Sequence, residues 1–426
     1  MQDIFQNLTW RGLIHQTTAD EQLPSWLNQQ TRTIYAGFDP TADSLHVGSL
    51  LPLMMLRRFQ KAGHRPIAVV GGATGMIGDP SGKSAERNLL SREQLAENLA
   101  GIEKQMRMLL DFDSGDTSAL VVNNNDWMSE FSYTDFLRDV GKNFPVNVML
   151  AKDSVKSRLS SEAGLSYTEF SYMLLQAYDF VHLNKNYGCE LQIGGSDQWG
   201  NVTAGIDLGR RMHSAQLYGM TCPLLTKSDG SKMGKTETGA IWLSADRTSP
   251  YSFYQYWVRV DDADAGKCLR FLTELEQEEI ESLDQSRQDE PGKRESQKRL
   301  AEELTKLIHG EAGLTKALRA SQIFFGAEIN ELSDSDLGEI FADVPNSDFV
   351  FAQLNGEGIS IIDALVESEL CKSKGEARRA IGEGSVYINN QRIGEIEFRL
   401  TRDHLASETM IVLRRGKKRY AVLRFS

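Results

Sequence analysis

Short apolar blocks, separated by polar and glycine-rich segments, run through the first half of the chain and predict alternating strands and helices. The blocks typical of buried strands are Thr33–Phe38 and residues 66–70, 119–122, 192–195 and 222–226. Between the first two, residues 50–62 carry apolar side chains at helical spacing and stop at Gly63. Strand, helix and strand with glycines at the strand ends predict a parallel α/β sheet.

The second half of the chain has a different pattern. From about residue 250 the strand-length blocks end, and residues 276–283 and 293–309 are charged and periodic, as in surface helices. Residues 341–357 contain acidic residues and glycine and show little periodicity, which predicts a linker. The chain is too long for a single core, so we expect a first domain at 1–249, a helical one at 250–340 and a small one at 358–426.

The last of these domains mixes short helices and strands. Ser360 and Ser373 each stand three residues before an acidic residue, Asp363 and Glu376, as in capping boxes that open helices. Three further signals are a strand at 385–388, a turn at Asn389-Asn390 and a basic, strand-like end at 414–424. A small α+β module follows from this order.

Composition excludes several classes of protein. With 40% hydrophobic and 25% charged residues the chain is typical of soluble globular proteins. The first twenty residues do not resemble a signal peptide, and no apolar run approaches the roughly 20 residues needed to cross a bilayer. The four cysteines lie far apart without a C-x-x-C pair, which argues against structural zinc and a disulfide framework. We therefore expect a cytoplasmic protein.

Charge is unevenly distributed along the chain. The net charge is −12, yet residues 371–426 contain 13 Lys and Arg against 6 Asp and Glu, which leaves −19 for the other 370 residues. A basic tail on an acidic body favours a module that contacts a polyanion. On charge alone, an unevenly charged solvated surface is an equally good interpretation.

Three segments carry candidate chemistry, and the first, from Asp39 to Ser49, directly follows the first strand. Pro52 is tolerated only near the first turn of a helix, so the helix must begin close to Gly48. His46 and Gly48 then lie at a helix amino end, where free N–H groups and the helix dipole favour a phosphate. Gly48 would let a flat base approach the backbone. A capping or packing role for His46 is the alternative.

The second segment, residues 69–83 (VVGGATGMIGDPSGK), is rich in glycine after a strand, which indicates close approach of the backbone to a ligand. GATGMIG resembles the nucleotide-binding turn of short-chain NAD(P) oxidoreductases, and GDPSGKS resembles a Walker A loop whose first glycine is one residue too close. Those oxidoreductases use a Y-x-x-x-K pair, which none of the twelve tyrosines provides. An oxidoreductase is therefore the less favoured interpretation.

The third segment, residues 226–236 (TKSDGSKMGKT), holds Lys232 and Lys235 in a loop of small and polar residues. Two lysines on such a loop can close as a cationic clamp on a pentavalent phosphate, which gathers negative charge. Taken alone, the pattern is more typical of a solvated hairpin turn.

In this order, and with the lysine segment about 185 residues after the histidine, the three segments resemble the HIGH and KMSKS signatures of class I aminoacyl-tRNA synthetases. YAGFDPTADSLHVG, SYMLLQAYDF, QIGGSDQWGN and SDGSKMGKT are similar to the bacterial tyrosyl-tRNA synthetases, and the similarity extends over essentially the whole chain. One departure is Ser49, which stands where the family has its second histidine and can still donate to a phosphate. The resemblance implies a Rossmann-like parallel-sheet catalytic domain, an α-helical anticodon-stem-binding domain and a small RNA-binding module.

The resemblance also implies a two-step reaction. The carboxylate of L-tyrosine attacks the α-phosphorus of ATP, and the 3′-terminal ribose hydroxyl of tRNA-Tyr then takes the tyrosyl group from the adenylate. Because the nucleophile is already an anion, positioning and charge stabilisation must supply the rate. Mg²⁺ would accompany ATP, with no tightly bound cofactor. By resemblance the catalytic residues are His46, Ser49, Lys83, Arg87, Lys232, Lys235 and Thr236, and those around ATP include Gly37, Asp39, Thr41, Gly48, Gly195 and Asp197.

Amino-acid specificity is expected from a polar pocket. Tyr172, Gln176 and Asp179 lie at i, i+4 and i+7, hence on one helix face, although the solvated side of an amphipathic helix would show the same spacing. The resemblance places Asp179 and Tyr35 at the phenol of tyrosine, and Tyr172, Gln176, Asp79 and Gln198 at its amino end. Phenylalanine would leave the buried aspartate unpaired, so the pocket should reject it. About 140 residues separate the second and third segments, which leaves little room for an editing domain.

The resemblance further implies RNA and subunit contacts. The RNA-binding residues would be Lys372, Lys374, Arg378, Arg379, Arg414, Arg415, Lys417 and Lys418. A homodimer is implied, with its interface inside residues 125–165, and no membrane partner. Two alternatives stay open: a tryptophanyl-tRNA synthetase, which would lack the basic tail and the Asp179–Tyr35 pair, and a non-catalytic RNA-binding paralogue, which would not need His46, Lys232 and Lys235.

Overall fold

The computed structural model describes residues 3–81, 90–160, 164–236, 239–329, 332–341 and 344–426. The chain divides into two compact units. Unit 1 comprises Met1–Thr248 and Trp257–Ile308, and unit 2 comprises Ser249–Tyr256 and His309–Ser426. Among the described helices, none combines the length and the apolar character that crossing a bilayer requires.

Unit 1 is built on a six-stranded sheet with the order β1-β6-β5-β2-β3-β4. All neighbouring strands are parallel except β1, which runs antiparallel to β6 at one edge. The strands are β1 (Gln16–Thr17), β2 (Thr33–Phe38), β3 (Arg65–Val70), β4 (Leu120–Asn123), β5 (Cys189–Gly195) and β6 (Tyr218–Cys222). The predicted parallel α/β sheet is confirmed.

One predicted strand is misplaced. Residues 222–226 were expected to be a strand, but β6 ends at Cys222 and the next residue is Pro223. Proline has no N–H to donate to a neighbouring strand, so it favours a strand end. The apolar residues after it form the approach to the lysine-containing segment.

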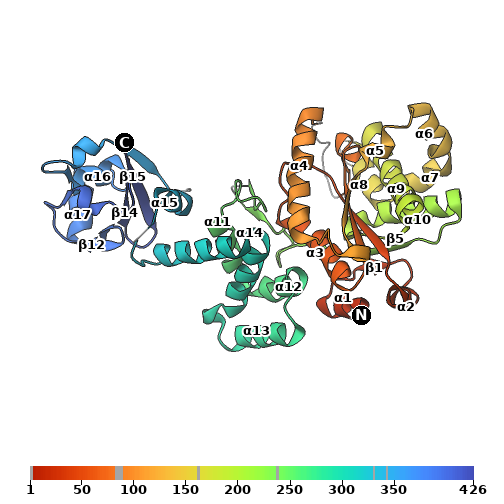
Figure 1. The fold of residues 1–426 in the computed structure, drawn as a ribbon, viewed down its shortest axis with the longest axis horizontal. Helices are drawn as coiled ribbons and strands as arrows, with labels where there is room; N and C mark the ends of the chain where they lie inside the picture. Colours follow the sequence, from red (N-terminus) through yellow and green to blue (C-terminus); the bar gives the residue numbers. More distant parts are fainter. Residues whose placement is uncertain (1–2, 82–89, 161–163, 237–238, 330–331, 342–343) are drawn as a thin grey trace. The chain divides into compact units, whose positions relative to one another are not determined.

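Helices pack on both faces of this sheet. Figure 1 shows α3 and α4 on one side and α9 and α10 on the other. These four helices are α3 (Val47–Lys61), α4 (Arg92–Leu109), α9 (Tyr167–Tyr187) and α10 (Trp199–His213). Because successive strand residues point to opposite faces, Tyr35, Ile67 and Val69 share one face and pack with Phe180 of α9 in one core cluster.

The strand order alone indicates where a ligand site should lie. β2 lies between β3 and β5, so the chain moves to one side of β2 first and to its other side later. In open parallel sheets a ligand binds at the carboxyl ends of the strands where the order reverses in this way. Three segments follow these strands. The Asp39–Ser49 region follows β2, the glycine-rich segment follows β3, and a short turn at Ser196–Gln198, called the SDQ turn below, follows β5.

Shorter helices complete unit 1. Those outside the four sheet-packing helices are α1 (Ile4–Arg11), α2 (Leu23–Gln29), α5 (Asn125–Met128), α6 (Tyr133–Asp139), α7 (Val146–Leu150), α8 (Asp153–Leu159), α12 (Asp262–Leu272) and α13 (Gln277–Asp289). The expected helical stretch after residue 250 is present: α11 spans Pro250–Val258 and α14 spans Glu295–Phe324. Inside α14, Gly310 has φ 72° and ψ 179°, a backbone conformation open to glycine alone.

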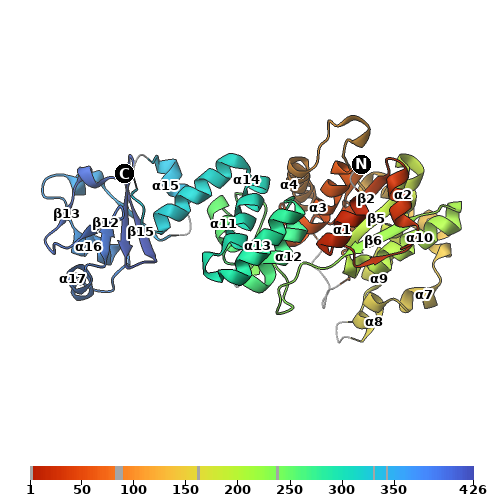
Figure 2. The ribbon, with the colours of Figure 1, turned by 90° about the horizontal axis from the view of Figure 1, so that it is seen from below.

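Unit 2 contains a five-stranded sheet with the order β12-β11-β14-β15-β9 and a separate pair, β10-β13. Its elements are α15 (Asp334–Ile340), β9 (Asn346–Phe349), β10 (Ile359–Ser360), α16 (Ile361–Glu367), α17 (Lys374–Gly382), β11 (Val386–Ile388), β12 (Gln391–Ile393), β13 (Arg399–Leu400), β14 (Met410–Arg415) and β15 (Arg419–Phe425). Figures 1 and 2 show α16 and α17 on one side of the larger sheet and α15 on the other. The two sides match the alternation of β14, where Ile411 and Leu413 pack in one cluster and Met410 and Val412 in the other.

Two sequence expectations for unit 2 need correction. The predicted linker at 341–357 contains β9, which pairs in parallel with β15, so Phe349 belongs to the core of the module. The weak periodicity arose because β9 is a short edge strand. Ser360 and Ser373 do cap α16 and α17, but Ser360 accepts its hydrogen bond from Ile362 rather than from the acidic residue three positions on.

Candidate active site

A cavity lies at the carboxyl ends of β2, β3 and β5, as the strand order predicts. Most of the expected site residues line it: Tyr35, Gly37, Asp39, Thr41, His46, Gly48, Ser49, Asp79, Tyr172, Gln176, Asp179, Gly195, Asp197 and Gln198. They come from four separate stretches of the chain: residues 35–49, Asp79, residues 172–179 and residues 195–198. The fold therefore brings together residues that the sequence connects only through resemblance.

At the deep end of the cavity a carboxylate is fixed by two donors. Trp127 Nε1 donates to Asp179 Oδ1 at 2.8 Å, and Asn124 Nδ2 donates to Asp179 Oδ2 at 3.0 Å. Asn124 is itself held, because its Oδ1 accepts from the backbone N–H of Ala73 at 2.7 Å. The carboxylate is thus oriented before any ligand is present.

Next to this carboxylate lies the buried hydroxyl of Tyr35. Tyr35 is 1% exposed, and its hydroxyl has no hydrogen-bond partner among the described residues. A buried, unpaired polar group is costly, so its presence in a cavity wall points to a ligand that supplies the partner. Burial raises the pKa of Tyr35 well above its ordinary value, with a further contribution from Asp179, so the hydroxyl stays protonated.

Asp179 has an unusual proton affinity for an aspartate. Burial raises its pKa to about 7, while the hydrogen bonds from Asn124 and Trp127 pull it in the opposite direction and Asp39 raises it further. The two donors therefore only partly offset the loss of hydration. An O–H or N–H donor from a ligand would stabilise the ionised form.

A second polar cluster lies nearer the mouth of the cavity and is acidic. Tyr172 Oη donates to Asp39 Oδ2 at 3.0 Å, and Gln198 Nε2 donates to Asp79 Oδ2 at 2.7 Å. Gln176 Nε2 lies 3.4 Å from Gln198 Oε1, and the Oε1 of Gln176 is buried without a partner among the described residues. Carboxylates and amide oxygens together make a suitable environment for an ammonium group.

Asp39 connects this cluster to the glycine-rich segment. The sequence groups Asp39 with the ATP residues, yet its Oδ1 accepts from Thr74 Oγ1 at 2.8 Å and its Oδ2 from Tyr172. Gly71 is required here, because a Cβ at that position would overlap the Asp39 carboxylate and the Thr74 hydroxyl. The third carboxylate, Asp197, has a pKa raised first by burial and then by the charge of Asp79.

The helix amino end predicted at His46 and Gly48 is present. His46 is the N-cap residue of α3, with extended backbone angles, and its ring packs edge-to-face against Trp242 at 6.2 Å between centroids. A Cβ on Gly48 would lie 2.7 Å from the Cε1 atom of the His46 ring, so glycine allows this ring to fold over the first turn. His46, Gly48 and Ser49 line the cavity beside this turn, in which Val47 N–H donates to Ile241 O and Ser49 N–H to His46 O.

The two lysines occupy a surface hairpin and do not line the cavity. We call residues 226–235 the lysine hairpin: Thr226 and Lys232 form an antiparallel bridge, and Lys227 N–H donates to Ser231 O at 2.8 Å. The side chains of Lys232 and Lys235 are exposed. Thr236 lies in β7 (Lys235–Thr236), which pairs with β8 (Gly239–Ala240). Lys83 and Arg87 lie outside the described residues.

The basic residues expected to contact RNA divide into three groups in unit 2. Lys372, Arg378, Arg379, Lys417 and Lys418 are exposed. Lys374 and Arg415 are paired with acidic residues, Asp363 and Glu376, each at 2.7 Å. Arg414 is only 9% exposed, and its guanidinium lies 3.8 Å from the centroid of the Tyr387 ring.

Sequence reasoning missed the residues that orient Asp179. Asn124 and Trp127 lie 55 and 52 positions from it along the chain, so no local pattern connects them. The signal that was available is the polar run NNND, which begins at the last residue of β4, because polar residues at the carboxyl end of a parallel strand lie near the ligand site. Within the described ranges, no group of three or more His, Cys, Asp or Glu side chains could hold a metal ion.

Comparison with known proteins agrees with this geometry. The family described as tRNA synthetases class I (W and Y) matches residues 27–326, and the C-terminal domain described for SYY-like tyrosine–tRNA ligases matches residues 336–423. The chain therefore belongs to the class I tRNA synthetases of the tryptophan and tyrosine type.

Within that family the similarity is to the tyrosine enzymes, over the whole chain. The tyrosine–tRNA ligase of Rhodopirellula baltica is 60% identical over 421 residues, which cover 99% of this chain and 96% of the relative. That of Roseiflexus castenholzii is 53% identical over 424 residues, with complete coverage of both chains. A C-terminally truncated mitochondrial tyrosyl-tRNA synthetase of Aspergillus nidulans superposes with a TM-score of 0.68 at 31% identity, over 76% of this chain and 94% of that structure.

Proposed function

We propose that the chain is a tyrosine–tRNA ligase, which activates L-tyrosine with ATP and transfers the tyrosyl group to the 3′ end of tRNA-Tyr. The observation that carries this proposal is the pair at the deep end of the cavity: an oriented buried carboxylate, Asp179, beside the unpaired hydroxyl of Tyr35. A phenol can donate to the first and accept from the second. The phenol of tyrosine satisfies both groups at once.

The same pair supplies the discrimination against phenylalanine. Without a phenol hydroxyl, a buried carboxylate and a buried hydroxyl would each lack a partner, at a cost of several kcal/mol in total on the roughly 1–3 kcal/mol scale of each unsatisfied group. A site built to hydrogen-bond a hydroxyl rejects the analogue that lacks it far more strongly than an apolar pocket rejects a missing methylene. An editing activity is therefore unnecessary.

The acidic cluster receives the other end of the amino acid. Asp79, Tyr172, Gln176 and Gln198 surround the place where the ammonium of tyrosine would lie, with the unpaired Gln176 oxygen as one acceptor. In this arrangement the carboxylate of tyrosine points away from Asp39 and Asp79 and toward the amino end of α3. The nucleophile is thereby directed at the phosphate region.

ATP would lie between the first turn of α3 and the SDQ turn after β5. His46 and Ser49 would donate to its phosphates, Gly48 and Asp197 would meet the adenosine, and Lys232 and Lys235 would reach the pyrophosphate side. Mg²⁺ is part of the nucleotide substrate in this proposal. Lys83, Arg87 and Thr236 keep their predicted phosphate roles, with Gly37, Asp39, Thr41 and Gly195 at the edge of the nucleotide site.

The chemistry then needs alignment rather than acid–base catalysis. The tyrosine carboxylate attacks the α-phosphorus, the bond to the bridging oxygen of pyrophosphate breaks, and negative charge increases on the phosphoryl oxygens. Cationic and N–H groups at α3 and in the lysine hairpin would stabilise that charge. In the second step the ribose hydroxyl of tRNA attacks the tyrosyl carbonyl, and AMP leaves.

The remaining assignments are extensions of this proposal. The helices from residue 250 onward would approach the anticodon stem, and the exposed cations of unit 2, Lys372, Arg378, Arg379, Lys417 and Lys418, would contact tRNA phosphates. Lys374 and Arg415 would join them only by leaving their acidic partners. A cytoplasmic location fits this activity.

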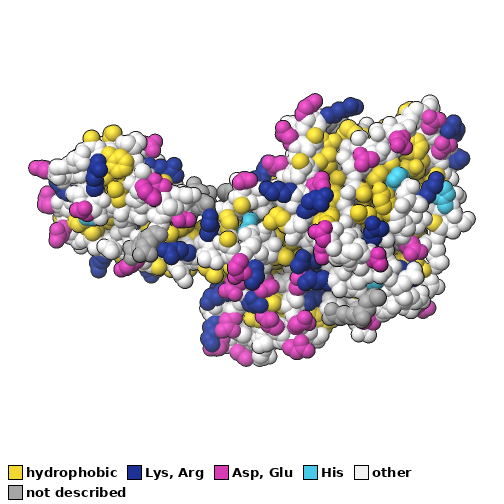
Figure 3. Space-filling model, viewed as in Figure 1, with side chains coloured by type: hydrophobic (Ala, Val, Ile, Leu, Met, Phe, Trp, Pro, Cys, Tyr) yellow, Lys and Arg dark blue, Asp and Glu magenta, His cyan; other side chains and the backbone are white. Residues whose placement is uncertain are grey.

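A homodimer is supported by exposed apolar side chains in the expected segment. Tyr133, Leu137, Val146, Val148, Leu150 and Leu159 are between 38% and 64% exposed, and Tyr167, two residues beyond the segment, is 62% exposed. Figure 3 shows hydrophobic side chains gathered at the surface of the part of unit 1 that carries α5 to α9. A patch of this kind on a water-exposed surface is typical of a protein interface, and a second copy of the chain is the proposed occupant.

The test is ATP–pyrophosphate exchange with each of the twenty amino acids and no tRNA. Exchange that depends on tyrosine and is nearly absent with phenylalanine and tryptophan is the expected result. Exchange with tryptophan would move the assignment to the sister enzyme. A folded protein that binds tRNA but exchanges with no amino acid would contradict the proposed function.

A further inference from the structure

Two consecutive residues of α12 contact both strands of the lysine hairpin. Lys267 Nζ donates to the backbone oxygen of Thr226 at 2.7 Å and lies 3.4 Å from its Oγ1, and Cys268 Sγ lies 3.3 Å from Met233 Sδ. Thr226 begins the outgoing strand, and Met233 is on the returning strand beside Lys232. One turn of one helix therefore holds the base of the hairpin on both sides.

Both contacted residues lie next to the candidate catalytic lysine, Lys232: Thr226 across the hairpin and Met233 along the chain. Thr226 pairs with Lys232 across the hairpin, and Met233 N–H donates to Leu225 O at 3.1 Å. Met233 is 4% exposed and Cys268 is fully buried, whereas the Lys232 side chain is exposed. The hairpin thus has a buried, fixed base and a charged, solvated end.

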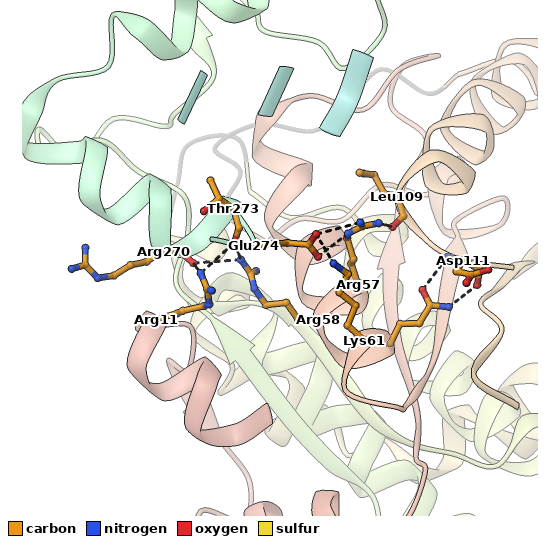
Figure 4. Close-up of polar contacts among 10 residues, drawn as sticks. Arg11, Arg57, Arg58, Lys61, Leu109, Asp111, Arg270, Thr273 and Glu274 are labelled. Atoms are coloured by element: carbon orange, nitrogen blue, oxygen red, sulfur yellow. Dashed lines mark hydrogen bonds and ion pairs between the residues drawn. The ribbon is translucent and has the colours of Figure 1, made fainter. Parts of the chain in front are cut away.

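The helix that holds the hairpin is itself fixed by two buried arginines, shown in Figure 4. Arg58 Nη2 donates to Thr273 O at 2.7 Å, and Arg11 donates to Thr273 O at 3.2 Å and to Leu275 O at 2.6 Å. These oxygens follow the carboxyl end of α12, where carbonyl groups lack helical partners and the dipole favours a cation. Arg58 belongs to α3, so α12 is anchored to the helix whose N-cap residue is His46.

The returning strand of the hairpin is tied to the other end of α3. Ile241 N–H donates to Gly234 O at 2.8 Å, and Ile241 O accepts from Val47 N–H at 3.0 Å. Val47 and Arg58 are eleven residues apart on α3, roughly 16 Å along a helix that rises 1.5 Å per residue. The lysine hairpin is therefore supported from both ends of α3, directly through Ile241 and indirectly through α12.

We propose that Lys267 is a positioning residue for the activation step, acting through Lys232. Its ammonium fixes the Thr226 carbonyl, and the backbone pairing of Thr226 with Lys232 then sets where the Lys232 side chain can reach. The charge-assisted hydrogen bond at 2.7 Å is of the stronger kind. Its loss should therefore shift the Lys232 side chain relative to the phosphates of ATP. This inference rests on the proposed function, because it concerns the phosphates that Lys232 would meet.

The first test is Lys267→Met in the full chain. Methionine keeps an unbranched side chain beside Phe271 but removes the donor to Thr226. The expected result is a fall of about tenfold to a hundredfold in kcat for tyrosine-dependent ATP–pyrophosphate exchange, with KM for tyrosine unchanged. Lys267→Arg, which can still donate to the carbonyl, should recover most of the rate. Lys104→Met, at an exposed position of α4, is the matched control and should leave exchange unchanged.

A second variant and a double-mutant cycle distinguish positioning from a general loss of structure. Lys267→Gln, whose side chain is too short to reach the Thr226 carbonyl, should show the same loss as Lys267→Met. In a Lys232→Met background, Lys267→Met should lower kcat by less than about twofold further, because the residue acts through Lys232.

Three results would overturn the inference. These are a wild-type kcat in both Lys267→Met and Lys267→Gln, a full additional loss in the Lys232→Met background, or a rise in KM for tyrosine that accounts for the whole effect. Absence of tyrosine-dependent exchange in the unmodified protein would overturn the proposed function and this inference together, so the two failures are distinguishable.

Discussion

The two charged regions of the candidate site are built in opposite ways. Asp179 is 3% exposed and receives hydrogen bonds from two side chains, one of which is fixed by a backbone N–H. Lys232 and Lys235 are exposed, and only the base of their hairpin is buried. The carboxylate of Asp179 is therefore held in a fixed orientation inside the protein. The ammonium groups of Lys232 and Lys235 lie in water at the end of a hairpin whose base is buried.

This difference separates specificity from rate. A charge in a fixed, dry site can distinguish two ligands that differ by one hydroxyl, because the wrong ligand leaves it unpaired. A charge in water distinguishes little, but it can be brought to a phosphate whose charge increases in the transition state. We therefore expect substitutions in the two regions to change different kinetic quantities.

The largest effect is expected in the lysine hairpin. Lys235→Ala should lower kcat for tyrosine-dependent pyrophosphate exchange by about a hundredfold to a thousandfold, as the loss of one transition-state charge contact does elsewhere, with KM for tyrosine unchanged. Steady-state exchange at saturating ATP measures this. Lys227→Ala, in the same hairpin, is the control and should change kcat by less than about threefold. A large rise in KM for tyrosine in Lys235→Ala would contradict the assignment of specificity and rate to different regions.

The next largest effect is expected at the deep end of the cavity. Asp179→Asn removes the negative charge and leaves an amide N–H₂ facing a donor from Trp127 or Asn124. We expect kcat/KM for tyrosine to fall by about a hundredfold, in line with roughly 3 kcal/mol for an unsatisfied charged partner. Exchange at varied tyrosine concentration measures it, and a tenfold or smaller loss would mean that the carboxylate is not the phenol acceptor.

A smaller effect is expected for the donor that orients this carboxylate. Trp127→Phe removes the Nε1 donor but keeps an aromatic ring to stack on His182, whose ring centroid lies 4.3 Å away. Loss of one hydrogen bond to a charged group should lower kcat/KM for tyrosine by about tenfold. His182→Leu, which removes the stacking partner and leaves the donor, should lower it less. The reverse order would show that packing and not the hydrogen bond holds Asp179.

Much of the fold followed from the chain itself. The strand at Thr33–Phe38 has the predicted bounds, and Pro52 correctly located the start of α3. Local rules succeed there because a proline or an apolar run constrains its own neighbourhood. The strand predicted at 222–226 is displaced because its apolar residues continue past Pro223, whereas the proline ends the pairing in the sheet.

The site was less accessible than the fold, since its contacts are long-range. Asp179 could be named from resemblance and helix spacing, but its orientation by Trp127 and Asn124 depends on where β4 lies relative to α9. The burial of Arg414 against Tyr387 is another tertiary result, because an arginine in a basic tail gives no sign of being buried. The contact of Lys267 with Thr226 could not be predicted from the sequence either, because the two residues are 41 positions apart.

The smallest expected effect concerns stability and pH. The folded-state pKa of Asp179 is about 7, above the ordinary 3.8, mainly because of burial. The unfolded chain therefore releases this proton at lower pH than the folded protein, and the contribution of Asp179 to stability falls as pH rises from about 4 to 7. Asp179→Asn removes this dependence, so the Tm of the variant minus that of the wild type should be more positive at pH 7.5 than at pH 5. An unchanged or reversed difference would contradict the raised pKa.

The separation of specificity from rate is tested most directly by the ratio of kcat/KM for tyrosine to that for phenylalanine, measured by pyrophosphate exchange in Asp179→Asn and Lys235→Ala. Asp179→Asn should lower the ratio by at least tenfold, because phenylalanine no longer leaves a buried carboxylate unpaired. Lys235→Ala should be slow with both amino acids and keep the wild-type ratio within about twofold. A fall of the ratio in Lys235→Ala, or an unchanged ratio in Asp179→Asn, would contradict the division of the site into a discriminating end and a rate-enhancing end.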